Sequence, residues 1–510
     1  MSSTPNEKDV ESLSLDDVKV DVARQESPVT SIDEKSKLYR LTRFLGRYGV
    51  ETHGIAPIPE EERVDTKRFQ LFMIWFSSNM NLTNLTSGAA GPVAFRLSFR
   101  DSAIVFLVAD VLSLLIPATF GIFGPQLGTR SMVQARFSWG YYGAILPSIF
   151  NVASMMGYLI LGVMVGGQLL AGASGHLSST DGIVILTMLS FVVTFCGYKF
   201  IHWFACLAWI PSLLGMFVML GVGGKHLHPS NYAMDDTPPA TAAAVLSFAA
   251  TVGAANLAWC TMTPDYGVYH DARSSPMIFA RTYFGLFIPS LMTHLLGAAF
   301  ASAASSVPAW AAAYEGGNNT GGLVAAILEP VHGFGKFLLV TMALSIVGAC
   351  GPIMYSFGMS LMNVHPVFAK IPRYIFAMVA TAIGIPLAIY AERNFYSSLV
   401  TFLDIIGYWT GSFSAIILME HVVFRRLEFT RYKVEEWNNP RKLPPGLAAV
   451  LAFALSFALI VPCMDQSFFV GPLAKKGTGD LGIMVGFALT CITYTALRAV
   501  EKWLFPSHDA

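Results

Sequence analysis

The sequence is poor in charged residues and has no excess of either sign. Charged side chains make up 13% of the 510 residues, against roughly 25% in an ordinary soluble domain. Hydrophobic residues make up 54% and gather in runs of about 20, the length that a membrane-spanning helix needs. Few polar residues separate these runs, so the composition excludes a soluble helical protein. The net charge of zero favours neither nucleic acid nor an acidic partner.

Motifs for disulfides, metal binding and hydrolysis are missing as well. The six cysteines form no CxxC pair and lie in apolar segments, where a thiol usually acts as a small hydrophobic group. The sequence contains neither an HExxH motif nor a His–Cys cluster. We therefore predict that the protein is not an enzyme and needs no cofactor. We also expect His294, inside an apolar run, to be a packing histidine rather than a proton relay.

Twelve apolar runs follow a polar N-terminal segment, which lacks the apolar core of a signal peptide. We predict spans at 71–95, 103–123, 144–171, 182–201, 203–223, 240–269, 277–303, 336–363, 374–392, 396–424, 445–464 and 481–504. Residues 1–65 should form a disordered cytosolic tail. Residues 66–424 should form a ten-helix transporter core, and residues 425–510 a cytosolic loop with two further helices.

The distribution of Lys and Arg over the short loops sets the expected orientation. Basic residues are more frequent in the loops that a cytosolic N-terminus would place inside, and the largest group lies between Arg425 and Lys442. Both termini are then cytosolic. The loop Ser305 to Pro330, which contains the glycosylation sequon Asn318-Asn-Thr320, is then external.

Two of the runs are interrupted, the first by a polar, glycine-rich stretch from Asn81 to Pro92 and the sixth by the stretch from Trp259 to Gly267. Backbone that leaves the helix at membrane depth is tolerated only where it lines a protein-enclosed cavity. Interruptions at corresponding places of two halves point to the binding site of a secondary transporter. We therefore predict an all-α membrane protein with a 5+5 inverted repeat, helices one and six broken, and two added helices. The repeat rests on the two breaks alone.

The polar cluster in the first interruption supplies the first candidate ligand contacts. An unsatisfied polar group costs several kcal/mol in hydrocarbon, so a cluster this dense should face an interior. Small residues also serve helix packing, but asparagine is not small. We expect Asn81, Asn84 and Thr86 to contact the edge of a ligand.

Aromatic residues of the third and sixth runs are the candidate walls. Trp259 lies in the middle of its run rather than at an end, where tryptophan often marks the membrane interface, and Tyr158 is the second wall. A flat ring gains about 1–3 kcal/mol from each aromatic stack. Gln168 is expected behind Tyr158, although a buried glutamine often only bonds a neighbouring helix.

The remaining candidates are a kinked run and several acids at membrane depth. Gly351-Pro352 should kink the eighth run, where Ser356 could close the site. Asp265 is our first choice for a coupling carboxylate, but it could equally cap a helix. Further intramembrane acids are Asp110, Asp404 and Glu420, of which Glu420 should meet Arg425 or water. Tyr408 and Trp409 could gate the cavity or belong to an interface belt.

Several spaced motifs, in the same order, resemble those of fungal purine-cytosine permeases, members of the first nucleobase–cation symporter family. They are Gly166-Gly-Gln168, Thr263-Pro-Asp-Tyr266, Asp404-Ile-Ile-Gly-Tyr-Trp409, Trp437-Asn-Asn-Pro440, Leu443-Pro-Pro-Gly446, Val470-Gly-Pro472 and Gly479-Asp480. The resemblance covers nearly everything from Arg40 to Phe505. It implies a LeuT-like fold and a proton-driven plasma-membrane symporter for cytosine, purines or related compounds.

The resemblance also implies that aromatic walls from spans three and six, and amides from spans three and eight, hold the substrate. Trp259 matches the wall of span six, whereas Tyr158 stands where tryptophan is usual. Gly162 stands where nucleobase members usually have asparagine, and Ala349-Cys-Gly-Pro-Ile353 replaces Asn-Asn-Ile-Pro-Asn. Cys350 thus stands in place of an amide that would discriminate strongly between ligands.

Three readings stay open for the ligand and the activity. The polar cluster of span one could read a nucleobase edge in place of the missing amides. The ligand could instead be a vitamin-type heterocycle such as pyridoxine or thiamine. A nutrient receptor that binds without transporting would need the same cavity.

Overall fold

The computed structural model describes residues 54–65, 69–195, 198–227, 240–272, 274–371 and 373–506. The expected N-terminal tail lies almost wholly outside these residues. The described chain is mostly helical, with one hairpin of two short strands, β1 (Asp465–Gln466) and β2 (Phe469–Val470). The strands are antiparallel, and Gln466 pairs with Phe469.

The helices are much as the apolar runs predict, with a few additions. In chain order they are α3 (Gln70–Asn79), α4 (Leu82–Ala94), α5 (Phe99–Ser113), α6 (Leu115–Leu127), α7 (Ser131–Gln134), α8 (Arg136–Gly143), α9 (Ile145–Ala173), α10 (Ser179–Phe195), α11 (Tyr198–Gly223), α13 (Ala242–Leu257), the 3-10 turn η3 (Ala258–Thr261), α14 (Thr263–Gly267), α15 (Ser275–Ala303), α16 (Pro308–Tyr314), α17 (Thr320–Leu328), α18 (His332–Val364), α19 (Arg373–Ala391), α20 (Phe395–Met419), α21 (Leu447–Cys463) and α22 (Gly482–Leu504).

Eight helical stretches among the described residues are long and apolar enough to cross a membrane, and Ser179–Thr194 and Leu447–Cys463 are shorter apolar helices. Large apolar side chains stand exposed on their outer faces, for example Leu112 of α5 at 60% and Ile492 of α22 at 70%. Such faces are compatible with lipid and not with water. The chain is therefore a multi-pass membrane protein.

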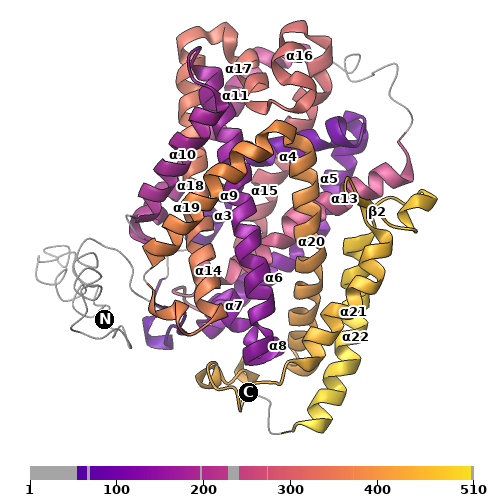
Figure 1. The fold of residues 1–510 in the computed structure, drawn as a ribbon. Helices are drawn as coiled ribbons and strands as arrows, with labels where there is room; N and C mark the ends of the chain where they lie inside the picture. The colour runs from indigo at the N-terminus through magenta and orange to yellow at the C-terminus, as the bar shows by residue number, and fades with distance from the viewer. Residues whose placement is uncertain are drawn as a thin grey trace, which may run out of the picture.

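Figure 1 shows these helices as a bundle of elongated rods. Helix α9 packs along α18, and α15 packs against α4. Helices α21 and α22 lie side by side at one edge, next to α20. The short helices α16 and α17 cover one end of the bundle, and α7 and α8 lie towards the other. The segment 305–330, expected as a loop, is thus largely helical.

Both predicted helix breaks are present, although the first is shorter than expected. Helix α3 ends at Asn79 and α4 begins at Leu82, so only Met80 and Asn81 leave the helix. The glycines that follow remain helical, and they allow close packing: a Cβ on Gly88 would stand 2.3 Å from the carbonyl oxygen of His294. In the sixth run, α13 ends at Leu257 and gives way to η3.

The eighth run, where a kink is expected at Gly351-Pro352, is not broken. Pro352 lies inside α18, which continues from His332 to Val364.

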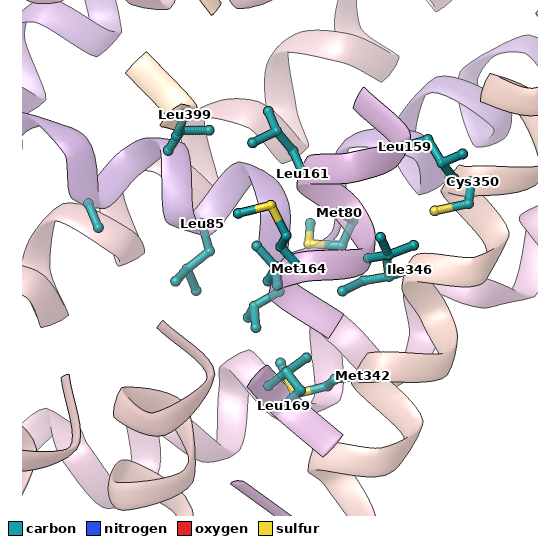
Figure 2. Close-up of a cluster of buried hydrophobic side chains, with 14 of the residues drawn as sticks. Met80, Leu85, Leu159, Leu161, Met164, Leu169, Met342, Ile346, Cys350 and Leu399 are labelled. Atoms are coloured by element: carbon teal, nitrogen blue, oxygen red, sulfur yellow. The ribbon is translucent and has the colours of Figure 1, made fainter. Parts of the chain in front are cut away.

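Figure 2 shows Met80, at the first break, among the side chains of α9 and α18 that pack there, including Met164 and Ile346. The first break is therefore embedded in the interior of the bundle.

At one end of α20, a buried cluster of charges joins this helix to α22. Glu420, expected to meet Arg425, accepts from Arg425 Nε at 3.0 Å and also from Arg498 Nε at 3.1 Å. The hydroxyl of Tyr494 donates to the same carboxylate at 2.9 Å. Arg498 pairs in addition with Glu501 at 3.0 Å. Each charge is thus compensated inside the protein, as a buried ion pair requires.

A second polar cluster ties the other end of α20 to the hairpin. Gln466 Nε2 donates to Asp404 at 2.9 Å and to Asp480 at 3.1 Å, and the hydroxyl of Tyr408 donates to Asp480. Trp409 Nε1 donates to Ser154 of α9 at 3.0 Å. Both aromatic residues are 3% exposed and bonded within the protein. They therefore do not belong to an interface belt.

We predict that Arg498→Met destabilises the protein strongly, because it leaves part of the carboxylate charge of Glu420 and Glu501 uncompensated. Breaking a buried pair in this way costs roughly 3–5 kcal/mol. The measurement is the melting temperature of the detergent-purified variant. Arg431→Met is the matched control, because Arg431 forms an exposed pair with Glu428 and should change stability little. Equal shifts for the two variants would contradict the prediction.

Candidate functional site

A cavity of about 970 Å³ of non-atom space, its opening included, lies where the two breaks meet. Helices α3, α4, α9, α13, α15, α18 and α20 contribute to its wall, together with η3 and α14. The lining residues are Trp75, Ser78, Asn81, Thr83, Asn84, Ser87, Tyr158, Leu161, Gly162, Ala255, Asn256, Ala258, Trp259, Met262, Tyr266, His294, Ile346, Ala349, Cys350, Pro352, Ile353, Leu399 and Leu403. A mostly apolar wall with a few polar groups is typical of a small-molecule site.

The polar part of the wall is the first break itself. Asn81 caps α4, because its Oδ1 accepts from Asn84 N at 3.0 Å while its Nδ2 donates to the Ser78 carbonyl at 2.6 Å. Asn84 Nδ2 donates to the backbone and side-chain oxygens of Asn79, both at 3.0 Å. Within the described chain, Asn84 Oδ1 accepts no hydrogen bond. Asn81 thus stabilises the break, and Asn84, which lines the cavity, keeps its side-chain oxygen without a donor among the described residues.

An aromatic wall stands beside this polar part. The Trp75 ring meets Trp259 edge-on with centroids 5.7 Å apart, and meets Tyr266 in the same way at 5.5 Å. Trp259 is half-buried, whereas Trp75 is 1% exposed. The Trp259 ring packs against the buried Trp75 ring, which Tyr266 contacts in turn, so a flat surface is preformed at the second break.

The facing wall comes from α9 and α18. The Tyr158 ring packs edge-on against Phe402 with centroids 5.6 Å apart, and its buried hydroxyl has no hydrogen-bond partner in the described part of the chain. One helical turn away, a Cβ on Gly162 would lie 3.3 Å from Cys350 Sγ. Because a glycine faces a thiol here, this side of the cavity offers no amide.

Three predicted site residues do not line the cavity. Thr86 donates to the Leu82 carbonyl at 2.8 Å within its own helix. Gln168 bonds the Asn318 carbonyl at 2.9 Å and the amide of Gly321 at 3.3 Å, which ties α9 to the cap helices. Ser356 is buried in α18, away from the lining. For Gln168, the structural role weighed at the outset is the one observed.

Asp265 also lies outside the lining, at the end of the cavity that α14 closes. Its carboxylate accepts from the backbone amide of Ser131 at 2.7 Å, at the start of α7. Nearby, Arg130 stands 5.4 Å from the centre of the Tyr355 ring, which in turn lies 6.4 Å from the Tyr266 ring. These contacts join α7, α14 and α18, so Asp265 helps to hold this end shut.

His294 is buried and hydrogen-bonded, as expected of a packing histidine whose polar atoms are satisfied. Its ring stacks on Phe106 with centroids 4.7 Å apart, but it also lines the cavity. His294 Nδ1 lies 3.0 Å from Asp110 Oδ2, and the amide of Asn256 donates to Asp110 Oδ1 at 2.8 Å. The sequence places these three residues in separate helices, so only the packing of α5, α13 and α15 reveals the group.

A cavity at the breaks of two membrane helices is typical of secondary transporters. The family described as permease for cytosine/purines, uracil, thiamine, allantoin matches residues 57–486. The chain belongs to this family.

Individual relatives agree with this assignment. The purine-cytosine permease fcyB of Emericella nidulans is 32% identical over 91% of this chain and 92% of its own length. The vitamin B6 transporter TPN1 of Saccharomyces cerevisiae is 28% identical over 90% of this chain and 89% of its own. Among solved structures, Mhp1, a nucleobase-cation-symport-1 family transporter crystallised closed with bromovinylhydantoin, aligns with a TM-score of 0.70 at 15% identity. It covers 89% of this chain and 96% of its own, so the two share the LeuT-type fold.

Proposed function

We propose that the protein imports a small, flat nitrogen heterocycle across the plasma membrane together with a proton, by alternating access. A nucleobase such as cytosine or a purine is the first candidate. The observation that carries the proposal is the cavity between the two helix breaks, where Trp259 offers a flat face and Asn84 an unused acceptor. An aromatic face and an amide edge are the contacts that a planar, hydrogen-bonding ring needs.

We propose twelve membrane crossings with both termini in the cytosol. The stretch Tyr374–Phe424 contains two helices, α19 and α20. The broken pair α3–α4 and the two shorter apolar helices bring the eight stretches to twelve crossings. The two broken crossings are then the first crossing of the first set of five and the first crossing of the second set, as an inverted repeat requires.

In this arrangement the substrate ring lies between Trp259 and Tyr158. A stack on each ring contributes about 1–3 kcal/mol. Asn84 Oδ1 accepts from a ring N–H, and Asn81 fixes the backbone that positions it. Opening of the contacts among Arg130, Tyr355 and Tyr266 releases the substrate to the cytosol.

A vitamin-type heterocycle such as pyridoxine is the second candidate, and one contact favours it. Gly162 and Cys350 face each other across the wall, at the two positions where the resemblance predicts amides for a nucleobase. A ring with bulkier or less polar substituents on that side fits a glycine and a thiol better than two asparagines. The relationship to a vitamin B6 transporter is in keeping with this candidate.

A competition experiment tests the substrate class. Uptake of labelled adenine and labelled pyridoxine is measured in cells without native carriers for either compound, against unlabelled purines, pyrimidines, hydantoins, thiamine and pyridoxine. We expect one class to compete and the others to fail. Binding of a labelled compound without uptake or exchange would instead indicate a receptor.

The double variant Gly162→Asn with Cys350→Asn tests the role of the α9–α18 wall. If the wall selects a vitamin-type ring, added amides should raise the affinity for adenine relative to pyridoxine about tenfold or more, since each placed hydrogen bond discriminates strongly. Gly384→Asn, away from the cavity, is the control. An unchanged ratio of affinities would exclude these positions from substrate selection.

We predict that Trp259→Ala abolishes uptake at low substrate concentration, because it removes a stack worth about 1–3 kcal/mol. Uptake is measured beside the amount of protein at the cell surface. Trp503→Ala is the matched control, because Trp503 is 79% exposed in α22. Normal uptake by the Trp259 variant would refute the stacking role.

Asp265→Asn tests whether this carboxylate couples transport to protons. If it carries the coupling proton, the variant should still exchange substrate but no longer concentrate it. If it only fastens α7 through Ser131, both activities should decline together because the inner closure loosens. Accumulation and exchange in reconstituted vesicles separate the two outcomes.

A further inference from the structure

We propose that the buried pair Asp110–His294 is the proton-binding site of the transport cycle. This inference rests on the proposed proton symport and assigns it to residues. The three helices α5, α13 and α15 converge on the pair, and His294 and Asn256 form part of the cavity wall. The pair therefore reaches the substrate cavity directly through the imidazole.

The immediate partners of Asp110 leave its negative charge without a fixed cation. Asp110 is 0% exposed and accepts from Asn256 Nδ2 at 2.8 Å and from His294 Nδ1 at 3.0 Å. Asn256 is neutral, and no Lys or Arg of the described chain forms an ion pair with Asp110. A charge at membrane depth is costly unless it is neutralised. A proton on the pair supplies that neutralisation.

Other titratable or charged groups on the surrounding helices are few. On α15, the hydroxyl of Tyr283 donates to the carbonyl of Val111, the residue after Asp110, at 3.1 Å. Arg100 and Asp101 lie in the first turn of α5, roughly 14 Å along the helix. Arg281 lies roughly 20 Å from His294 along α15. Helices α4, α6 and α13 carry none.

The position of the pair links its protonation to substrate binding. Without a proton the pair carries one negative charge, which water in an empty cavity solvates through the imidazole. A substrate that covers this wall removes that water and disfavours the charged form. Substrate and proton therefore favour each other's binding, and the coupling must be reciprocal.

The proton balance of one cycle is simple. The outward-open protein takes one proton from external water onto the pair, which becomes neutral, and binds substrate. After the inner end opens, substrate leaves, cytosolic water enters the cavity, and the pair releases the proton to it. The empty, singly negative site then returns to the outer side.

The variant His294→Asn tests the assignment. Its amide can still donate to Asp110 from the place of Nδ1, but it cannot take up a proton. In vesicles containing the purified protein, we expect exchange of labelled adenine or pyridoxine to persist, while accumulation driven by an imposed pH gradient falls to equilibrium. Wild-type uptake should rise as the external pH falls, whereas uptake by the variant should not change with pH. Concentrative, pH-dependent uptake by His294→Asn would overturn the proposal.

Two controls distinguish the loss of this proton site from misfolding and from proton coupling at another residue. His176→Asn changes an exposed histidine of a loop and should behave as wild type. Asp110→Asn should reproduce the loss of accumulation. If Asp265→Asn alone is uncoupled and both pair variants still concentrate substrate, the proton site is Asp265 and the proposal is wrong.

A second measurement needs no substrate and keeps the proposal separate from the proposed function. Infrared difference spectra of the purified protein between acid and alkaline pH should contain carboxyl and imidazole bands that Asp110→Asn and His294→Asn both remove. Spectra identical to wild type in both variants would overturn the assignment, whatever the protein transports. A wild-type protein that moves neither labelled compound but shows these bands would challenge the choice of substrate and leave the proton site standing.

Discussion

The structure depends on the cost of backbone polar groups that leave a helix inside a membrane. The helix is interrupted at Met80 and Asn81 and again at η3, so backbone groups at both places lose regular α-helical partners. Lipid cannot satisfy these groups, so the breaks must face protein or an enclosed cavity. Asn81 and Asn84 answer part of this need with their own amides. The surrounding helices shield the remaining backbone groups from lipid, and the space between these helices is the cavity.

Close helix packing completes the enclosure. Gly88 lies against the backbone of His294, and Gly297 lies against the backbone of Leu85, where a Cβ would stand 1.9 Å from the carbonyl oxygen. At these two contacts the backbones of α4 and α15 touch with no side chain between them. The same contact brings the His294 imidazole to the cavity wall. The helix that seals the break thus also carries the ionisable group of the site.

Local sequence patterns predicted the breaks, the apolar runs and the aromatic wall, because a short stretch of consecutive residues is enough to recognise each of them. An asparagine cluster between apolar runs, or a tryptophan in the middle of a run, needs no knowledge of distant contacts. Asp110, Asn256 and His294 were not joined in advance, since their partnership depends on how three helices pack. The partners of Gln168 could not be named for the same reason: they lie in the segment of the cap helices, 150 and 153 residues away.

The charge cluster around Glu420 has a consequence for how the chain is made. Its acidic member, Glu420, directly follows α20, whereas Arg498 belongs to α22, which is synthesised later. Until then, an intermediate carries a carboxylate with only Arg425 beside it. Insertion of α22 therefore supplies the second arginine and the Tyr494 hydroxyl that the Glu420 carboxylate needs. A prematurely terminated chain would keep this defect permanently and present cellular quality control with a mark of incomplete synthesis.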